Sequence, residues 1–144
     1  MFDLPETASV AQENIERAGL AGRLRGRGGD LSRDALGEGY DLIWCSSVLH
    51  FIPDPHATLC RIFAALRPGG VLVCVQAEIP PSPDAALAVL PYYLSMRMLG
   101  RHVTRAGELY QALERAGFGG LETVREVPFP MAPVTAVIGR RSAS

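Results

Sequence analysis

Hydrophobic residues along this chain follow two alternating patterns. Residues 40–45 and 71–76 form nearly continuous apolar runs, which is typical of strands buried on both faces of a parallel sheet. Elsewhere, apolar residues recur every three or four positions, the spacing of an amphipathic helix. This spacing predicts helices over residues 5–18, 54–66, 84–99 and 104–116.

Shorter elements complete the pattern: strands over residues 2–3, 23–29, 121–127 and 134–139, and a short helix over residues 32–36. The alternation of strands and helices predicts an α/β fold with a mostly parallel sheet and right-handed crossovers. The last two strands have no helix between them, so we expect an antiparallel C-terminal hairpin at one edge of the sheet. Residues 1–144 are expected to form one domain.

Two of the predicted helices have further features. The helix over residues 84–99 is apolar on almost every side, which indicates that other groups cover it. The helix over residues 104–116 is expected to begin at Thr104, because threonine is a favoured N-cap residue, and Gly117 follows its end. Pro128, Pro130 and Pro133 are expected to shape the connection between the last two strands.

Composition and charge narrow the function classes. The chain has 144 residues, of which 48% are hydrophobic and 20% charged, as in compact globular domains. The formal net charge is -1, so we expect no nucleic-acid partner, because such partners are held largely by basic surface. The longest apolar run, residues 71–75, is too short to span a membrane, and we expect no membrane partner.

The cysteines are Cys45, Cys60 and Cys74. Because no two are separated by only two residues, their spacing predicts neither a zinc site nor a redox pair, and we expect all three to be buried thiols. The few histidines and scattered acidic residues also predict no metal site. Reduced thiols, together with a start that lacks the features of a signal peptide, favour a cytoplasmic location.

Polar side chains stand at or just after the ends of the first four predicted strands: Asp3, Asp30, Ser46, Ser47, His50, Gln76 and Glu78. Ligands of open α/β sheets bind at the carboxyl ends of the strands. A carboxylate there can accept hydrogen bonds from ribose hydroxyls, and a second one in the next unit can reach an adenine amino group. Asp3 and Asp30 are placed for these two tasks; the alternative is that each caps its own helix or turn.

Four segments carry a resemblance to a known family: FDLPET at residues 2–7, AGLAGRLRGRGGDL at 18–31, YDLIWCSSVLHFIPDPHATLCRIFAALRPGGVLVCV at 40–75, and TRAGELYQALERAGF at 104–118. In this order and at this spacing they resemble the class I S-adenosylmethionine-dependent methyltransferases, most closely the small-molecule O-methyltransferases. The resemblance implies a Rossmann-like methyltransferase sheet, S-adenosylmethionine as cofactor, and a hydroxyl group of a small molecule as methyl acceptor.

The resemblance also implies that part of the family's domain precedes this sequence. The family's first strand and its glycine-rich cofactor loop would come before Phe2, so we expect the chain to be the C-terminal part of a catalytic domain. In the family, that strand lies between the strand ending at Asp3 and the strand over residues 40–45. Without it, two strand edges lack partners, and we expect a homo-oligomer or a complementary chain that supplies the strand.

Site residues follow from the resemblance position by position. The positions that match cofactor-binding residues of the family are Asp3, Leu4, Gly29, Asp30, Leu31, Cys45 and Ser46. His50 matches the catalytic base, which removes a proton from the acceptor hydroxyl. Imidazole suits this task because its pKa lies near neutral pH. A purely structural role for His50 is an equally weighted alternative.

Two positions depart from the family pattern. Gln76 and His102 stand where the family has acidic residues, the first of which orients the histidine. Gln76 can accept a hydrogen bond from imidazole, but it has no charge to stabilise imidazolium, which puts the strength of His50 as a base in doubt. Glu78 shares the strand face of Gln76 and is a candidate substitute.

The remaining alternatives concern pocket and function. Tyr92, Tyr93, Met96 and Met98 match a region that lines the family's acceptor pocket, and core or dimer packing explains them equally well. A non-catalytic remnant or accessory subunit is the second functional hypothesis, favoured by Gln76 and by the missing glycine loop. A nicotinamide-dependent oxidoreductase is the third, because an acid after the second strand also binds ribose there. The antiparallel final strands count against it.

Overall fold

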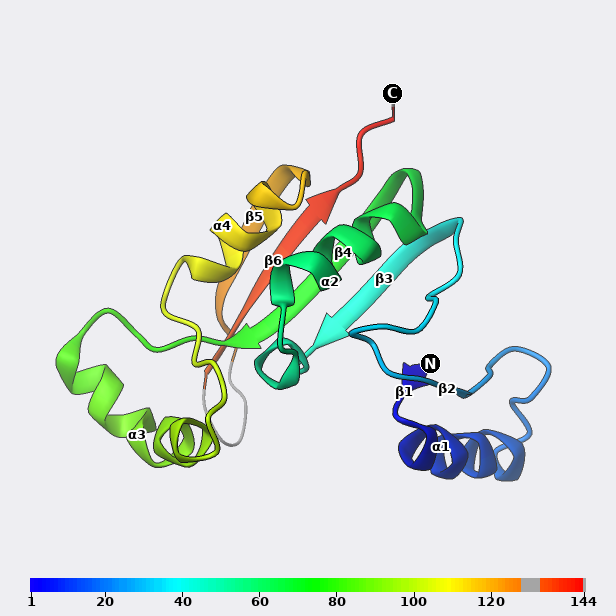
Figure 1. Ribbon diagram of the computed structural model, residues 1–144, viewed down its shortest axis with the longest axis horizontal. Coiled ribbons are helices and arrows are strands. Elements are labelled where there is room, and N and C mark those ends of the chain that lie inside the picture. Colours follow the sequence, from blue (N-terminus) through cyan, green and yellow to red (C-terminus); the bar gives the residue numbers. More distant parts are fainter. Residues whose placement is uncertain (128–132, 144) are drawn as a thin grey trace. The chain divides into compact units, whose positions relative to one another are not determined.

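The computed structural model describes residues 1–127 and 133–143. It consists of two compact units, Met1–Gly37 and Glu38–Ser144, and each unit is described by itself. Each contains its own sheet, with two strands in the first unit and four in the second (Figure 1).

The first unit consists of β1 (Phe2–Asp3), α1 (Pro5–Arg17) and β2 (Arg27–Gly28). β1 and β2 are parallel, with Asp3 opposite Gly28. α1 begins at Pro5, where the missing N–H of proline would have had no helical partner. Next to β2, a Cβ at Gly29 would come within 2.6 Å of the Phe2 ring. Glycine at this position therefore allows the chain to pass close to Phe2.

The short helix predicted over residues 32–36 is wrong, because residues 31–34 form a turn. The Asp34 N–H donates to the Asp30 carbonyl at 2.8 Å. The Asp30 carboxylate accepts from the Ser32 N–H at 2.8 Å and from the Ser32 hydroxyl at 2.6 Å. These side-chain bonds satisfy backbone groups locally and so compete with a helix.

The second unit contains, in chain order, β3 (Tyr40–Ser46), the 3-10 helix η1 (Leu49–Phe51), α2 (Pro55–Ala65), β4 (Leu66–Ala77), α3 (Pro83–Met98), α4 (Glu108–Arg115), β5 (Gly119–Val127) and β6 (Val134–Arg140). The strand order is β3-β4-β6-β5. β3 and β4 are parallel, and β6 is antiparallel to both of its neighbours, β4 and β5. The predicted α/β fold with a C-terminal antiparallel hairpin is confirmed.

Local signals explain where α2 begins and where it gives way to β4. Asp54 caps α2 by accepting a hydrogen bond from the Ala57 N–H at 2.9 Å, and Pro55 occupies the first helical position. The helix ends where Leu66 adopts an extended conformation. β4 therefore begins before residue 71, where the apolar run predicted its start.

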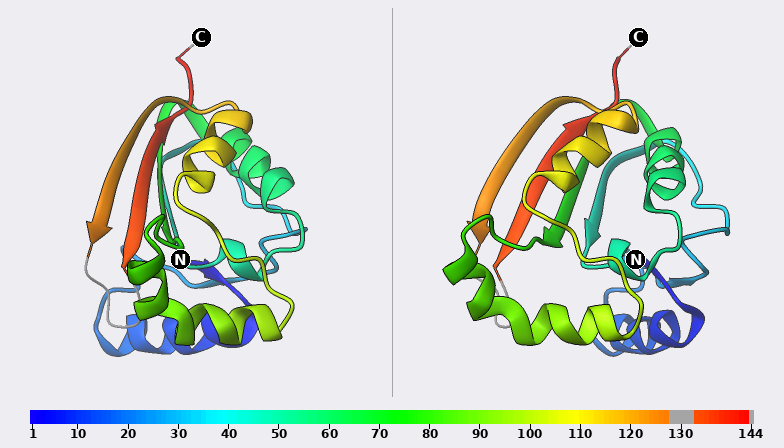
Figure 2. Two further views of the ribbon diagram at one scale, coloured as in Figure 1. Left: turned by 90° about the vertical axis from the view of Figure 1, so that its left-hand side faces the viewer. Right: turned by 60° about the vertical axis from the view of Figure 1, so that its left-hand side comes forward.

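One face of the four-stranded sheet carries the main core. Figure 2 shows α2 and α4 on this face. The fully buried side chains come from the sheet and these helices: Thr58, Leu59, Ile62, Leu66, Leu72, Cys74, Leu109, Leu113 and Val137. Side chains at i and i+2 of a strand share a face, so Leu72 and Cys74 lie together beneath the helices. This layer is the main core of the second unit.

The opposite face is only partly covered. Val75, Ala77 and Val134 pack with Val89 and Tyr93 of α3. Farther from the carboxyl ends of β3 and β4, Leu42 and Trp44 are 56% and 64% exposed. The prediction that β3 is buried on both faces is therefore wrong for this face. Among the described residues, β3 pairs only with β4 and β1 only with β2, so both strands have an edge without a partner.

Two helix predictions need correction. The helix predicted from Thr104 begins only at Glu108, because the preceding segment bonds to Ile79 instead: the Ile79 N–H donates to the Thr104 carbonyl at 2.8 Å, and the Ala106 N–H donates to the Ile79 carbonyl at 3.1 Å. α3 forms nearly as predicted, but its outward side is not covered. The exposed apolar residues on it are Leu87, Leu90, Leu94 and Met98.

The remaining predictions have mixed outcomes. Cys45 and Cys74 are buried thiols, as predicted, but Cys60 is exposed. Of the three prolines in the last connection, Pro128 and Pro130 lie outside the described residues.

Among the described residues, no helix combines the length and the apolar character that a membrane span requires.

Candidate functional site

His50 lies at the carboxyl end of the parallel pair β3–β4. β3 ends at Ser46, the chain turns sharply at Ser47, and His50 is in the middle of η1. Ser47 has a φ of 52°, which is uncommon for a residue with a side chain. Its N–H donates to the Val75 carbonyl at 2.9 Å, and this bond ties the turn to β4. The turn thereby fixes where η1 and its histidine begin.

This turn gives a testable prediction. Ser47→Val is expected to destabilise the protein by about 1–2 kcal/mol, because a β-branched side chain strongly resists a positive φ. Ser46→Val is the control, since Ser46 lies in the extended strand and valine favours strands. Urea unfolding measures both variants. Equal stability of the two variants would contradict the strained turn.

His50 and Gln76 form a buried pair. Gln76 Nε2 lies 2.7 Å from His50 Nδ1. Gln76 is 2% exposed and His50 is 7% exposed. Burial and, second, the positive charge of Arg101 lower the pKa of His50. The imidazole is therefore held in one orientation and favours its neutral form.

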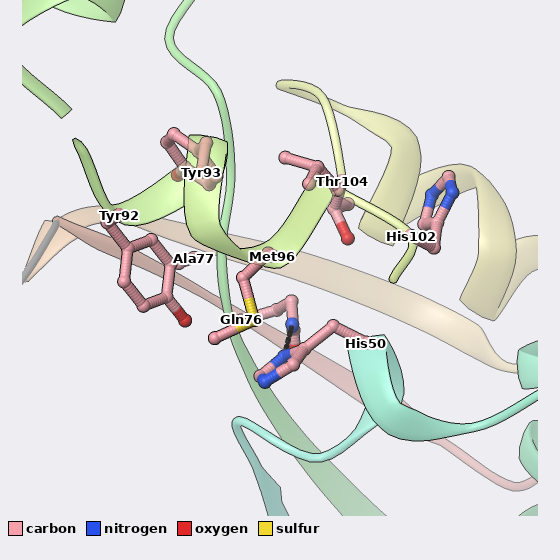
Figure 3. Close-up of a pocket in the computed structure, with 9 residues that line it drawn as sticks. His50, Gln76, Ala77, Tyr92, Tyr93, Met96, His102 and Thr104 are labelled. Carbon is pink, nitrogen blue, oxygen red and sulfur yellow. Dashed lines mark hydrogen bonds between the residues drawn. The ribbon is translucent and has the colours of Figure 1, made fainter. Parts of the chain in front are cut away.

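A pocket lies beside this pair. Its lining residues are His50, Gln76, Ala77, Tyr92, Tyr93, Met96, His102, Val103 and Thr104. Figure 3 shows Tyr92 and Met96 of α3 reaching toward the His50–Gln76 pair. Two buried polar atoms of the described residues lack hydrogen-bond partners, Gln76 Oε1 and the Tyr93 hydroxyl oxygen, and both residues line the pocket. Burial, followed by Tyr92 and Glu78, raises the pKa of Tyr93 to about 12.

The structure assigns other tasks to two side chains that the sequence placed near His50. Glu78 accepts a hydrogen bond from the Leu109 N–H at 3.2 Å, so this buried carboxylate stabilises the start of α4, where the helix dipole favours a negative charge. His102 pairs with Glu108 at 3.4 Å, and its ring points away from His50 (Figure 3). Gln76 is therefore the residue that orients His50.

Arg101 and Phe51 are site residues that the sequence analysis missed. The ring centroids of Phe51 and His50 are 4.0 Å apart. The Arg101 guanidinium lies over the Phe51 ring, 5.5 Å from its centroid. The backbone N–H of Arg101 donates to the Met96 carbonyl at 2.9 Å. This bond ties the backbone of Arg101 to the end of α3. No motif marks Arg101 among the many arginines of the chain, so only the fold reveals it.

The first unit holds five of the predicted cofactor-binding residues. Asp3 is exposed at the end of β1, and its Oδ1 accepts from the Leu4 N–H at 2.8 Å. Asp30 follows the neighbouring strand; besides its bonds to Ser32, its Oδ2 pairs with Arg33 at 3.3 Å. The parallel pairing thus brings the Asp3, Leu4 and Gly29–Leu31 positions to the same end of β1 and β2.

The other two predicted cofactor-binding residues, Cys45 and Ser46, end β3 in the second unit. Cys45 lies opposite Cys74 of β4. A hydrogen bond between the thiols lowers the pKa of Cys45 and raises that of Cys74, which burial raises further. Ser46 is exposed and is the last residue before the Ser47 turn.

Comparisons with known proteins show the family to which the chain belongs. The model of the Methyltransferase domain family matches residues 5–123. Demethylspheroidene O-methyltransferase of Rhodobacter capsulatus is 32% identical over 142 residues, 96% of this chain and 34% of the relative. N,N-dimethyltransferase OxyT of Streptomyces rimosus is 36% identical over 121 residues, 82% of this chain and 35% of the relative.

Among solved structures, the mitomycin 7-O-methyltransferase MmcR superposes with a TM-score of 0.74 at 27% identity, over 98% of this chain and 41% of that protein. The chain thus spans about a third of the length of the two curated relatives. Because the family model covers most of the chain, this protein belongs to the Methyltransferase domain family.

Proposed function

We propose that this chain forms part of the catalytic domain of an S-adenosylmethionine-dependent O-methyltransferase that acts on a hydroxyl group of a small molecule. The observation that carries the proposal is the buried His50–Gln76 pair beside a pocket at the carboxyl ends of β3 and β4. Ligands of α/β sheets bind at this end. Membership of the methyltransferase family supports the same chemistry.

The residues of the first unit fit one part of such a cofactor. Asp3 is exposed and uses Oδ1 for the Leu4 N–H, so Oδ2 can accept a ribose hydroxyl. Leu4, Gly29 and Leu31 would contact the cofactor beside it. Cys45 and Ser46 stay predicted cofactor-binding positions at the end of β3. The carboxylate of Asp30 already holds its own turn, so a contact from Asp30 to adenine would have to keep these bonds. S-adenosylmethionine supplies a sulfonium methyl group, which replaces the hydroxyl proton of the acceptor.

His50 is the proposed catalytic residue, because it is the titratable group that Gln76 holds beside the pocket. Tyr92, Tyr93 and Met96 would contact the acceptor from α3. We propose that the acceptor is a small molecule and that the protein has no nucleic-acid partner. The cytoplasmic location stays a prediction.

A second candidate function is an accessory or non-catalytic methyltransferase subunit that needs another chain or a second copy. The unpaired edges of β1 and β3 among the described residues favour it, as does the exposure of Leu42 and Trp44. In that case, methyl transfer would appear only after a complementary chain is added.

A methyl-transfer assay tests the proposal. The purified protein is incubated with S-adenosylmethionine labelled in its methyl group and with a panel of phenols, anilines and carbon acids. We expect label on oxygen, identified by mass spectrometry of the products. The panel includes anilines because one relative is named an N,N-dimethyltransferase. Label on nitrogen or carbon alone would contradict O-methyl transfer, and no labelled product would contradict activity of the protein on its own.

A further inference from the structure

We propose that the pocket beside His50 binds the acceptor as an oxyanion that accepts a hydrogen bond from the His50 Nε2–H. The Arg101 guanidinium, which lies over the adjacent Phe51 ring and outside the pocket lining, contributes positive charge from nearby. The substrates of such a site are acidic phenols and similarly acidic enols, which lose their proton to water before methyl transfer. This inference rests on the proposed methyltransferase function and names the class of its substrate.

The hydrogen bond to Gln76 determines the tautomer of His50. Gln76 Nε2 lies 2.7 Å from His50 Nδ1, and an amide nitrogen donates but does not accept hydrogen bonds. Nδ1 must then be the nitrogen without a proton, and a neutral imidazole carries its proton on Nε2. Figure 3 shows Nδ1 facing Gln76, with the other ring nitrogen directed away from it. His50 therefore presents a donor, and not the lone pair that a general base needs.

The orientation of the Gln76 amide follows from the cost of unpaired polar atoms. In this orientation, one oxygen, Oε1, is buried without a partner among the described residues. The reverse orientation would pair Oε1 and leave the NH₂ group, with both its hydrogens, in the buried position. Buried donors without partners are rarer in proteins than under-used oxygens.

A positive side chain lies near the imidazole. Arg101 lies over Phe51, 5.5 Å from its ring centroid, and the Phe51 centroid is 4.0 Å from that of His50. Gln76 is neutral, and the carboxylate of Glu78 is bonded to the Leu109 N–H. The negative charge of Glu78 acts on Tyr93, whereas the charge that acts on the imidazole is the positive one of Arg101, which lowers the pKa of His50. This positive charge disfavours imidazolium and favours an anion beside the ring.

The other titratable groups of the pocket are consistent with this charge. They are Tyr92, Tyr93 and His102. Burial raises the pKa of both tyrosines, that of Tyr93 to about 12, so both stay neutral near pH 7. His102 faces Glu108. No negative side chain of the described pocket lining competes with a bound oxyanion.

The proton balance is simple in this arrangement. The acceptor hydroxyl gives its proton to water, and the oxygen keeps the electron pair that forms the new bond to the methyl carbon. The bond between that carbon and the sulfonium sulfur would break, with its electron pair left on sulfur. His50 keeps its own proton throughout and donates a hydrogen bond to that oxygen. Acceptors with weakly acidic hydroxyls, such as alcohols, would be poor substrates, because they are not ionised near neutral pH.

Nitrogen-15 NMR of the purified protein without a methyl donor tests the tautomer. We expect His50 to carry its proton on Nε2. Gln76→Glu is expected to draw a proton to Nδ1, because a carboxylate only accepts. Gln111→Glu, which adds the same charge at an exposed position of α4, is the control and should leave the tautomer unchanged. A proton on Nδ1 in the unmodified protein would overturn the proposal, whether or not the variants fold.

Binding of 4-nitrophenol tests the oxyanion site, since its phenol and phenolate forms differ in visible absorption. We expect saturable binding of the phenolate at a pH where the free probe is mostly protonated. Arg101→Gln and His50→Phe are each expected to weaken this binding about tenfold or more, as expected for loss of a charged or charge-assisted partner. Arg97→Gln, at an exposed position in the last turn of α3, should have no effect. Binding of the protonated form, no saturable binding, or equal affinities in all variants would overturn the proposal.

Both measurements omit the methyl donor, so they separate this inference from the proposed function. If the protein transferred no methyl group, the proposed function would fail, but the measured tautomer and phenolate affinity would still support or contradict the oxyanion site. An Nδ1–H tautomer in a protein that methylates phenols would overturn the oxyanion site alone.

Discussion

Leu72→Ala is expected to destabilise the protein by about 3 kcal/mol, within the range for buried leucines whose removal leaves a cavity. Leu72 is 0% exposed in β4, an interior strand of the four-stranded sheet. Its side chain shares a face with Cys74, beneath α2 and α4. The sheet and the two helices enclose Leu72, so they leave little room for neighbouring atoms to fill the space that the substitution vacates.

Urea unfolding of Leu72→Ala measures the loss from the shift of the transition midpoint at constant slope. Leu42→Ala is the matched control, because Leu42 lies on the neighbouring strand β3 but is 56% exposed. We expect it to cost less than about 1 kcal/mol. A loss of the same size at both positions would mean that the helix-covered face does not dominate the stability of this unit.

His50→Ala is expected to lower the rate of methyl transfer by about 10²-fold to 10³-fold, the usual effect of removing one group that contacts a reacting oxygen. The loss should appear in kcat/KM, with part of it in KM, because His50 also holds the oxyanion before methyl transfer. His56→Ala is the control, since His56 is exposed at the start of α2 and contacts Cys60 at 3.8 Å. His56→Ala should keep full activity.

Thermal unfolding of both histidine variants accompanies the kinetics, because removing His50 leaves Gln76 unpaired in a buried place and lowers stability as well. Activity of folded His50→Ala within twofold of the unmodified protein would show that His50 only packs, which is the structural alternative.

The periodicity of the sequence predicted most elements of the fold, since α1, α2, α3, β3, β5 and β6 lie where it placed them within a few residues. Its errors came from interactions that periodicity does not contain. α4 starts late because Ile79, from a distant strand end, binds the backbone of residues 104–106. The apolar run of β3 indicated burial, but whether a second layer covers Trp44 depends on neighbours that the run does not specify.

For the site, strand ends were the useful signal. They placed His50 and Gln76 near each other, and the structure joins them by a hydrogen bond. The resemblance put Gln76 at the position that orients the histidine, and Glu78 stayed a candidate substitute because both share a strand face. The start of α4 decides it, since it takes the Glu78 carboxylate as its cap. Arg101 escaped notice because its proximity to His50 depends on how α3 ends.

Isothermal titration of the purified protein with S-adenosylhomocysteine tests the central claim, a methyltransferase cofactor site, most directly. We predict saturable binding at micromolar concentrations in the unmodified protein. Asp3→Ala should weaken it at least about tenfold, because a carboxylate bound to ribose hydroxyls makes charge-assisted hydrogen bonds. Glu6→Ala, an exposed acid in the first turn of α1, should leave it unchanged. No heat of binding from the folded protein, or equal affinity in Asp3→Ala, would contradict this cofactor site.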